Sequence, residues 1–143
     1  MIAEFRGEYR WLSNFWPSPV SYDGVTYACV ENAYQAAKTT PDHRDIFNRV
    51  SPGGAKRLSR TVPIRGDWDQ VRVAVMRGLL TQKFAYGSTL GDRLMATGDV
   101  PIEEGNTWGD RFWGVCQGSG ENQLGRLLME LRQALWLESV GLG

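Results

Sequence analysis

The sequence has a single histidine and only two cysteines among its 143 residues. With His43 alone, a paired-histidine metal site is excluded, and a Ser-His-Asp or Cys-His mechanism would have only this residue as its base. Cys29 and Cys116 lie far apart and not in a metal-binding spacing, so we expect free thiols in a reducing cytoplasm. The sequence therefore predicts neither a metal site nor another cofactor.

The chain also lacks a net charge, because sixteen Lys and Arg residues balance sixteen Asp and Glu residues. This balance argues against a protein that coats nucleic acid by bulk electrostatic attraction, although it allows a local basic patch. No apolar run approaches the length of a membrane span, and the first residues show no signal-peptide pattern. We expect a cytoplasmic protein without membrane contact.

The patterns that are present predict an α+β fold, a mainly α-helical single domain over residues 1–143 with a small β-hairpin near the N-terminus. Asp23-Gly24 suits a tight primed turn between β-prone flanks at 20–22 and 25–27. The helix that contains Glu31 should end before Pro41. Further helices are expected at 44–50, 51–60, 67–87, 88–95 and 122–136, with an irregular glycine-rich stretch at 105–120.

The most informative segment is the helix expected around 30–38, whose spacing places Glu31, Gln35 and Lys38 on one stripe. Lys38 is either a solvated cation in the last helical turn or a nucleophilic amine. The second role requires a desolvated pocket, because a lysine with its ordinary pKa of about 10.4 stays mostly protonated at neutral pH. The residues alone leave both interpretations open.

Glu31 likewise has two interpretations. A carboxylate near a helix start is stabilised by the helix dipole, so its role could be that of a cap alone. If Tyr34 or Trp68 supplies an apolar wall, however, the wall would raise the pKa of Glu31 and suit it to general acid–base catalysis.

Other segments could bind a ligand. The loop 103–114 mixes glycines, acids and aromatics, as functional loops often do, although Phe112 and Trp113 could simply fill a core. The glycines from Gly114 to Gly120 lead to a helix start at Asn122 that could cradle a phosphate. They match neither a P-loop nor a dinucleotide fingerprint.

Arginines and a polar turn complete the candidates. Arg57, Arg60 and Arg65 are each expected on a solvated surface, but together they are the best candidate for a phosphate-binding patch. The turn at Ser13-Asn14 could reach a sugar or a base.

Several short motifs occur in an order that matches one family over nearly the whole chain. They are Ser13-Asn14-Phe15, Tyr22-Asp23-Gly24, Glu31-x-x-Tyr34-Gln35-Ala36-x-Lys38, Ser51-Pro52, Ala55-Lys56-Arg57-Leu58, Arg65-x-Asp67-Trp68, Thr97-Gly98, Asp110-x-x-Trp113-Gly114 and Asn122-x-Leu124-Gly125. Each motif is unspecific by itself, whereas their shared order is specific. The chain resembles the YbiA-like family, also called NADAR (NAD and ADP-ribose related) domains.

The resemblance implies an N-glycosidase that cleaves the bond between a ribose anomeric carbon and a nitrogen. Family members act on early riboflavin-pathway intermediates, or remove ADP-ribose from guanine in DNA or RNA and so reverse a toxin-type modification. The resemblance places Glu31, Trp68, Asp110 and Trp113 in the active site, and Lys38 is expected to form a transient Schiff base with the ribose.

We accordingly expect Glu31, Lys38 and Asp110 to be catalytic. We expect the substrate to contact Ser13, Asn14, Tyr34, Gln35, Arg57, Arg60, Arg65, Trp68, Trp113, Gly114 and Asn122. Two features depart from the family pattern. Asn32 stands where many members have histidine, and the loop between Glu104 and Asp110 is about one residue longer, with Trp108 inserted.

These departures favour ADP-ribosylated guanine in DNA or RNA as the substrate. The resemblance further implies a functional pairing with a guanine ADP-ribosyltransferase toxin. The alternatives are riboflavin-pathway ribosylamine phosphates as substrates, or a non-catalytic module that binds ADP-ribose or NAD.

Overall fold

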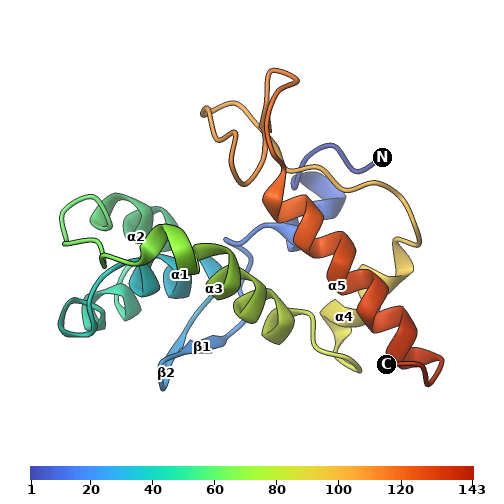
Figure 1. Ribbon diagram of the computed structural model, residues 1–143, viewed down its shortest axis with the longest axis horizontal. Coiled ribbons are helices and arrows are strands. Elements are labelled where there is room, and N and C mark those ends of the chain that lie inside the picture. The colour runs from blue at the N-terminus through green and yellow to red at the C-terminus, as the bar shows by residue number, and fades with distance from the viewer. The chain divides into compact units, whose positions relative to one another are not determined.

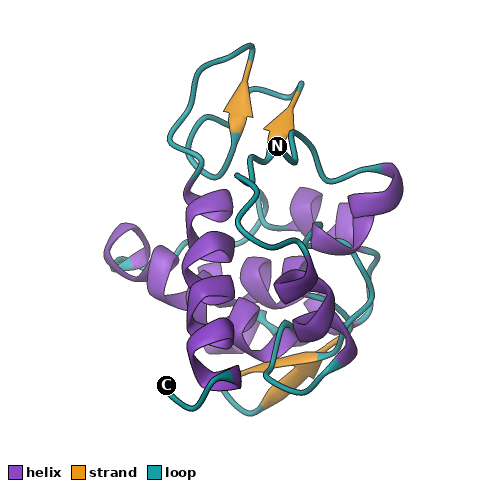
Figure 2. Cartoon of the chain, turned by 90° about the vertical axis from the view of Figure 1, so that its right-hand side faces the viewer, coloured by secondary structure: helices purple, strands orange, loops and turns teal.

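The computed structural model describes all residues, 1–143. The chain divides into two compact units, one formed by residues 14–83 and the other by residues 1–13 with 84–143. Helices predominate and the strands are short (Figures 1 and 2). The predicted α+β class, mainly helical with a small antiparallel sheet near the N-terminus, is confirmed. The single-domain organisation remains a prediction.

The unit formed by residues 14–83 contains the predicted hairpin, in which β1 (Val20–Tyr22) pairs antiparallel with β2 (Val25–Tyr27). Asp23 and Gly24 connect the strands with positive φ angles of 50° and 80°. Two successive left-handed residues form the primed turn that fits the twist of a hairpin. The turn predicted from Asp-Gly is therefore confirmed.

Helix α1 (Val30–Lys38) is the most buried element of this unit, since every residue from Val30 to Ala37 is buried. It packs against the hairpin, α2 (Pro52–Leu58) and α3 (Trp68–Lys83) (Figure 1). Burial on several sides requires its polar side chains to find partners within the protein. Glu31 and Gln35 of the predicted polar stripe therefore lie inside the structure and not on a solvated face.

Two buried polar side chains hold α1 in place. Asn32 donates from Nδ2 to the carbonyl oxygens of Phe47 and Val50, each over 2.9 Å. Arg44 donates from Nε and Nη2 to the carbonyl oxygens of Ala36 and Thr39, both over 3.0 Å. A cation at this end of the helix satisfies the last carbonyls and offsets the helix dipole.

Short segments connect α1 to the next helices. The segment predicted as a helix at 44–50 is instead a short 3₁₀-helix, η3 (Asp45–Asn48), and it follows another, η2 (Pro41–His43). Helix α2 begins as predicted, because Ser51 Oγ accepts a hydrogen bond from the backbone N–H of Gly54.

Helix α3 ends at Lys83, earlier than the predicted end at Gly87. The backbone N–H and the hydroxyl of Ser88 both donate to the carbonyl oxygen of Ala85, and this closes a tight turn in place of another helical turn. Gly87, with a φ angle of 83°, lies inside this turn. The glycine therefore shapes the turn after the helix and is not its C-cap.

The second unit contains η1 (Gly7–Leu12), α4 (Thr89–Ala96) and α5 (Gln123–Ser139), and α4 packs against α5. The stretch predicted as irregular at 105–120 contains a short parallel pair, β3 (Gly105–Asn106) with β4 (Val115–Cys116). Buried Arg132 of α5 donates to the Thr97 hydroxyl and the Val100 carbonyl oxygen.

Both cysteines are free thiols, as predicted, and the structure shows that both are buried. No helix has the length and apolar character that crossing a membrane requires. The side chains of His, Cys, Asp and Glu form no group of three or more that could hold a metal ion.

Candidate functional site

The predicted polar stripe of α1 is centred on Glu31, whose side chain is buried with 7% of the residue exposed. Gln35, one helical turn later, donates from Nε2 to the Glu31 Oε1 atom over 2.8 Å. The backbone N–H of Glu31 donates to the carbonyl oxygen of Asn14 over 3.0 Å. The carboxylate is therefore fixed by a neighbouring side chain and removed from bulk water, as a catalytic acid or base requires.

Lys38 ends the same helix and is half-buried. Burial lowers the pKa of its amine, Glu31 opposes this effect, and the cations Lys56, Arg60 and Arg72 lower the pKa further. A lowered pKa increases the fraction of neutral, nucleophilic amine near pH 7. Lys38 thus has the partly desolvated surroundings that the nucleophilic interpretation requires, and its role stays a prediction.

An aromatic wall lies beside this amine. The Lys38 Nζ atom is 5.6 Å from the centre of the Tyr34 ring. The centre of the Trp68 ring, from the first residue of α3, is 5.1 Å from that of Tyr34, with the planes tilted by 59°. Both residues are buried. The apolar wall expected from Tyr34 and Trp68 therefore forms within residues 14–83.

The three arginines of the predicted phosphate patch differ in their surroundings. Arg57 and Arg60 are exposed. Arg65 donates from Nε and Nη2 to the two carboxylate oxygens of Asp67 and from Nη1 to the Tyr22 hydroxyl. This pairing lowers the pKa of Asp67. The Arg65 guanidinium is thus hydrogen-bonded within the protein, whereas Arg57 and Arg60 are exposed and remain the candidates for the predicted phosphate patch.

The remaining predicted site residues belong to the other unit. Ser13 is half-buried and follows η1 directly. Asp110 accepts at Oδ1 from the backbone N–H groups of Phe112 and Trp113, over 3.1 and 2.9 Å. The Asn106 side chain bonds both the N–H and the carbonyl oxygen of Asp110. One carboxylate oxygen of Asp110 therefore orders the loop that carries Trp113.

Gly114 is required by close packing. A Cβ atom at this position would collide with the backbone oxygen and Oε2 of Glu104. Asn122 bridges the same region, because its Oδ1 accepts from the Glu104 N–H over 3.0 Å and its Nδ2 donates to the Ile102 carbonyl oxygen. The structure gives Gly114 and Asn122 roles in holding the loop together.

The start of α5 does not offer the predicted phosphate cradle. The backbone N–H groups of Gln123 and Leu124 donate to the carbonyl oxygens of Phe112 and Trp113, over 3.0 and 2.9 Å. Donors that are already paired with the protein cannot also point at an anion. This part of the prediction is wrong, because the preceding loop folds back over the helix end.

The comparison with known proteins agrees with the motif order. The NADAR domain model matches residues 3–136. The chain belongs to the NADAR family. The N-glycosidase YbiA of Escherichia coli is 38% identical over 136 residues, which cover 92% of this chain and 84% of that protein. The NMR structure of the same Escherichia coli protein superposes with a TM-score of 0.84 at 36% identity, covering 98% of this chain and 86% of the other.

Other NADAR relatives carry two kinds of name. An N-glycosidase of Nostoc punctiforme is 33% identical over 135 residues, covering 89% of this chain and 86% of that protein. A riboflavin biosynthesis protein of Vibrio vulnificus is 35% identical over 132 residues, covering 89% of this chain but only 36% of that protein. The names support hydrolysis of an N-glycosidic bond as the class of activity.

The two departures from the NADAR pattern have different structural settings. Asn32 is buried, and its side-chain amide donates hydrogen bonds to the carbonyl oxygens of Phe47 and Val50. These bonds connect α1 to the segment that follows it. Trp108 lies in the loop 103–114 with 54% of its surface exposed. Asn32 is thus part of the scaffold, whereas Trp108 is placed where a large ligand could contact it.

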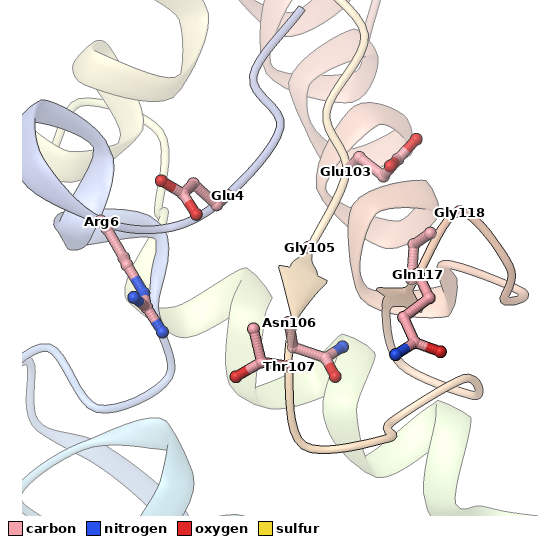
Figure 3. Close-up of a pocket in the computed structure, with 9 residues that line it drawn as sticks. Glu4, Arg6, Glu103, Gly105, Asn106, Thr107, Gln117 and Gly118 are labelled. Carbon is pink, nitrogen blue, oxygen red and sulfur yellow. The ribbon is translucent and has the colours of Figure 1, made fainter.

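A polar hollow of about 270 Å³ lies in the second unit (Figure 3). Segments carrying Glu4 and Arg6, Gly105 to Thr107, and Gln117 and Gly118 surround it in Figure 3. Its lining includes Asn106, whose amide holds Asp110. The hollow therefore adjoins the Asp110 loop. It could not be predicted from the sequence because its lining comes from separate segments.

Arg72 and the buried Lys83 were not predicted from the sequence. Arg72 follows Trp68 by one helical turn on α3, so helical spacing was a usable signal for its place near the aromatic wall. Lys83 gave no such signal, since a lysine at a helix end is usually solvated.

Proposed function

We propose that this chain is an N-glycosidase that hydrolyses the bond between a ribose C1 atom and a nitrogen, and that it removes ADP-ribose from guanine in DNA or RNA. One observation carries the proposal. Buried Glu31 and half-buried Lys38, with a lowered amine pKa, lie on one face of α1 beside the Tyr34 and Trp68 rings.

The reaction follows from these groups. As the C1–N bond breaks, its electron pair goes to the departing nitrogen, which takes a proton from Glu31 acting as general acid. The neutral amine of Lys38 attacks C1 and gives a proton to the Glu31 carboxylate, and the resulting ribosylamine opens to an imine as this proton moves to the ring oxygen. Water then adds to C1 of the imine, the bond between C1 and the Lys38 nitrogen breaks, and ADP-ribose and the free amine are released. Once Glu31 has given its proton to the departing nitrogen, its carboxylate stabilises the positive charge on the ribose.

Basic residues near the amine suit the phosphates of ADP-ribose. Lys56, Arg60 and Arg72 act electrostatically on Lys38, and Arg57 and Arg60 are exposed. Phosphate oxygens are good acceptors for guanidinium groups. A substrate anion among these cations would place its ribose close to Lys38. Ser13, Asp110 and Trp113 enter the proposal through the resemblance alone.

Riboflavin-pathway ribosylamine phosphates are the second candidate, because relatives from Vibrio vulnificus and Zea mays are named riboflavin biosynthesis proteins. Both candidate substrates contain a phosphorylated ribose joined to nitrogen, so the same residues would act on either. A non-catalytic ADP-ribose or NAD-binding module is less well supported, since binding alone needs neither a buried carboxylate nor an amine with a lowered pKa.

The decisive test incubates the protein with an oligonucleotide that carries ADP-ribosylated guanine, with and without borohydride, and measures masses. We expect free ADP-ribose, and in the borohydride sample a reduced adduct on Lys38. Release of ADP-ribose without an adduct on Lys38 would support the hydrolase activity and contradict the Schiff-base mechanism. No release, combined with cleavage of ribosylamine phosphates, would assign the enzyme to the second substrate class.

Removal of ADP-ribose from guanine would reverse the action of a guanine ADP-ribosyltransferase toxin, and we propose that the protein acts opposite such a toxin. Co-expression tests this pairing. The wild-type protein should restore growth of cells that produce the toxin, and Lys38→Ala should not.

A further inference from the structure

Two amide oxygens near Glu31 are buried and accept no hydrogen bond within the protein. They are the Oδ1 atom of Asn14 and the Oε1 atom of Gln35. Gln35 is 5% exposed. Most buried polar atoms in folded proteins are paired, and leaving an acceptor unpaired is unfavourable. Two unpaired acceptors in one region therefore indicate a place where a ligand supplies the missing donors.

Both amides are connected to the catalytic carboxylate. Gln35 donates from Nε2 to Glu31 Oε1, so its Oε1 atom remains free for another partner. The carbonyl oxygen of Asn14 accepts the backbone N–H of Glu31. The side-chain nitrogen of Asn14 lies 3.7 Å from the Met76 sulfur. The side-chain oxygen of Asn14, Oδ1, has no hydrogen-bond partner. Both unpaired acceptors thus belong to residues that are hydrogen-bonded to Glu31, one on α1 and one in the segment before the hairpin.

The missing partner must donate hydrogen bonds. A phosphate offers no donor near pH 7, and an aromatic base face offers none, whereas each ribose hydroxyl donates one. We propose that Asn14 Oδ1 and Gln35 Oε1 accept hydrogen bonds from the ring hydroxyl groups of the ribose that is cleaved. This inference rests on the proposed N-glycosidase function and identifies the residues that recognise its sugar.

The recognition predicts a preference for ribose over deoxyribose. A sugar that lacks one hydroxyl leaves one buried acceptor unpaired, and such sites reject the incomplete ligand strongly. Ribose 5-phosphate is the appropriate probe, because this fragment is common to ADP-ribose and to ribosylamine phosphates. Its 2-deoxy and 3-deoxy analogues carry the same aldehyde and phosphate, so the affinity ratio isolates the missing hydroxyl.

The experiment measures the dissociation constants of the three sugar phosphates by NMR titration, followed at the side-chain NH₂ signals of Asn14 and Gln35. We expect the wild-type protein to bind ribose 5-phosphate at least about tenfold more tightly than either deoxy analogue. Asn14→Ala should abolish the preference for one hydroxyl, and Gln35→Met the preference for the other. Asn14→Asp, which retains an acceptor oxygen, should preserve the preference.

Gln133→Ala, which removes an exposed amide from α5, is the matched control and should leave all ratios unchanged. Three outcomes would contradict the proposed ribose subsite. The wild type could bind the three sugars with equal affinity or bind none of them, or the preference for ribose 5-phosphate could survive in both variants. If the preference is found but no N-riboside is cleaved, the subsite stands and the proposed hydrolase function fails.

Discussion

The Gln35 amide and the Glu31 carboxylate form a hydrogen bond of 2.8 Å across one turn of α1, inside the protein. This bond fixes the orientation of the only carboxylate that lies on the same helix as Lys38. A fixed orientation lowers the cost of proton transfer to a bound substrate.

Glu31→Gln should therefore act on the rate constant. The amide keeps the shape of the side chain but cannot exchange a proton, so we expect kcat to fall by about 10² to 10⁴ with KM nearly unchanged. Steady-state kinetics on the preferred substrate checks this. Glu138→Gln on the exposed face of α5 is the control. A change confined to KM would make Glu31 a binding residue.

Lys38→Ala should lose nearly all turnover, because the proposed reaction uses the Lys38 amine to attack the ribose carbon. Lys38→Arg should be equally inactive, since guanidinium keeps the charge but is not nucleophilic. Both variants should give native circular dichroism spectra, and neither should form an adduct with borohydride. Full activity of either variant would exclude the covalent mechanism.

Arg60 and Arg65 should respond differently to removal. Exposed Arg60→Ala should raise KM for a phosphorylated substrate about tenfold and leave stability unchanged. Arg65→Ala breaks bonds to Asp67 and Tyr22 and should lower stability measurably but modestly, because the Asp67 pair is exposed to solvent. Kinetics and urea denaturation of both variants separate the two roles. If Arg65→Ala raised KM more than Arg60→Ala does, Arg65 and not Arg60 would be the residue that binds the phosphate.

Lys83 should make stability depend on pH. Burial lowers the pKa of Lys83 to about 7, and the residue is 2% exposed. Since the unfolded pKa is about 10.4, folding disfavours the charged amine, and this penalty is absent above that pH. It grows as the pH falls toward 7 and is complete below it, where it reaches roughly 3–5 kcal/mol.

Lys83→Met removes this ionisable group. We expect the difference in unfolding free energy between variant and wild type to increase in favour of the variant from pH 10 to pH 7, and then to stay constant. Denaturant titrations of both proteins across this range provide the measurement. Parallel pH profiles would show that Lys83 stays charged in the folded state.

Gly114→Ala should destabilise the loop that carries Asp110 and Trp113. The added methyl group would collide with Glu104, so we expect a loss of about 2 kcal/mol or more in stability. Gly78→Ala is the matched control, because its position on α3 is exposed and has open space around it. That substitution should raise stability by up to about 1 kcal/mol. Thermal unfolding of both variants distinguishes the two cases.

Local signals in the sequence predicted much of the fold. Asp23-Gly24 specified a primed turn, and Ser51-Pro52 specified a helix start, because each depends on the conformational preferences of adjacent residues. The parallel pair of β3 and β4 was missed, since each strand is only two residues long and its partner lies across a loop. Strands this short carry no periodic signal.

The sequence by itself determined the order of the helices, the polar stripe of α1 and the membership of the NADAR family, since all three are written in residue types and short spacings. Only the tertiary structure decided which polar groups are free to act. In the folded protein, Arg65 is hydrogen-bonded to Asp67, and Asn32 to the backbone carbonyl oxygens of Phe47 and Val50. The first N–H groups of α5 donate to carbonyl oxygens of the preceding loop. The tertiary structure also leaves the amide oxygens of Asn14 and Gln35 unpaired. The physical reason is that hydrogen-bond pairing and burial depend on residues distant in the chain, which local spacing does not encode.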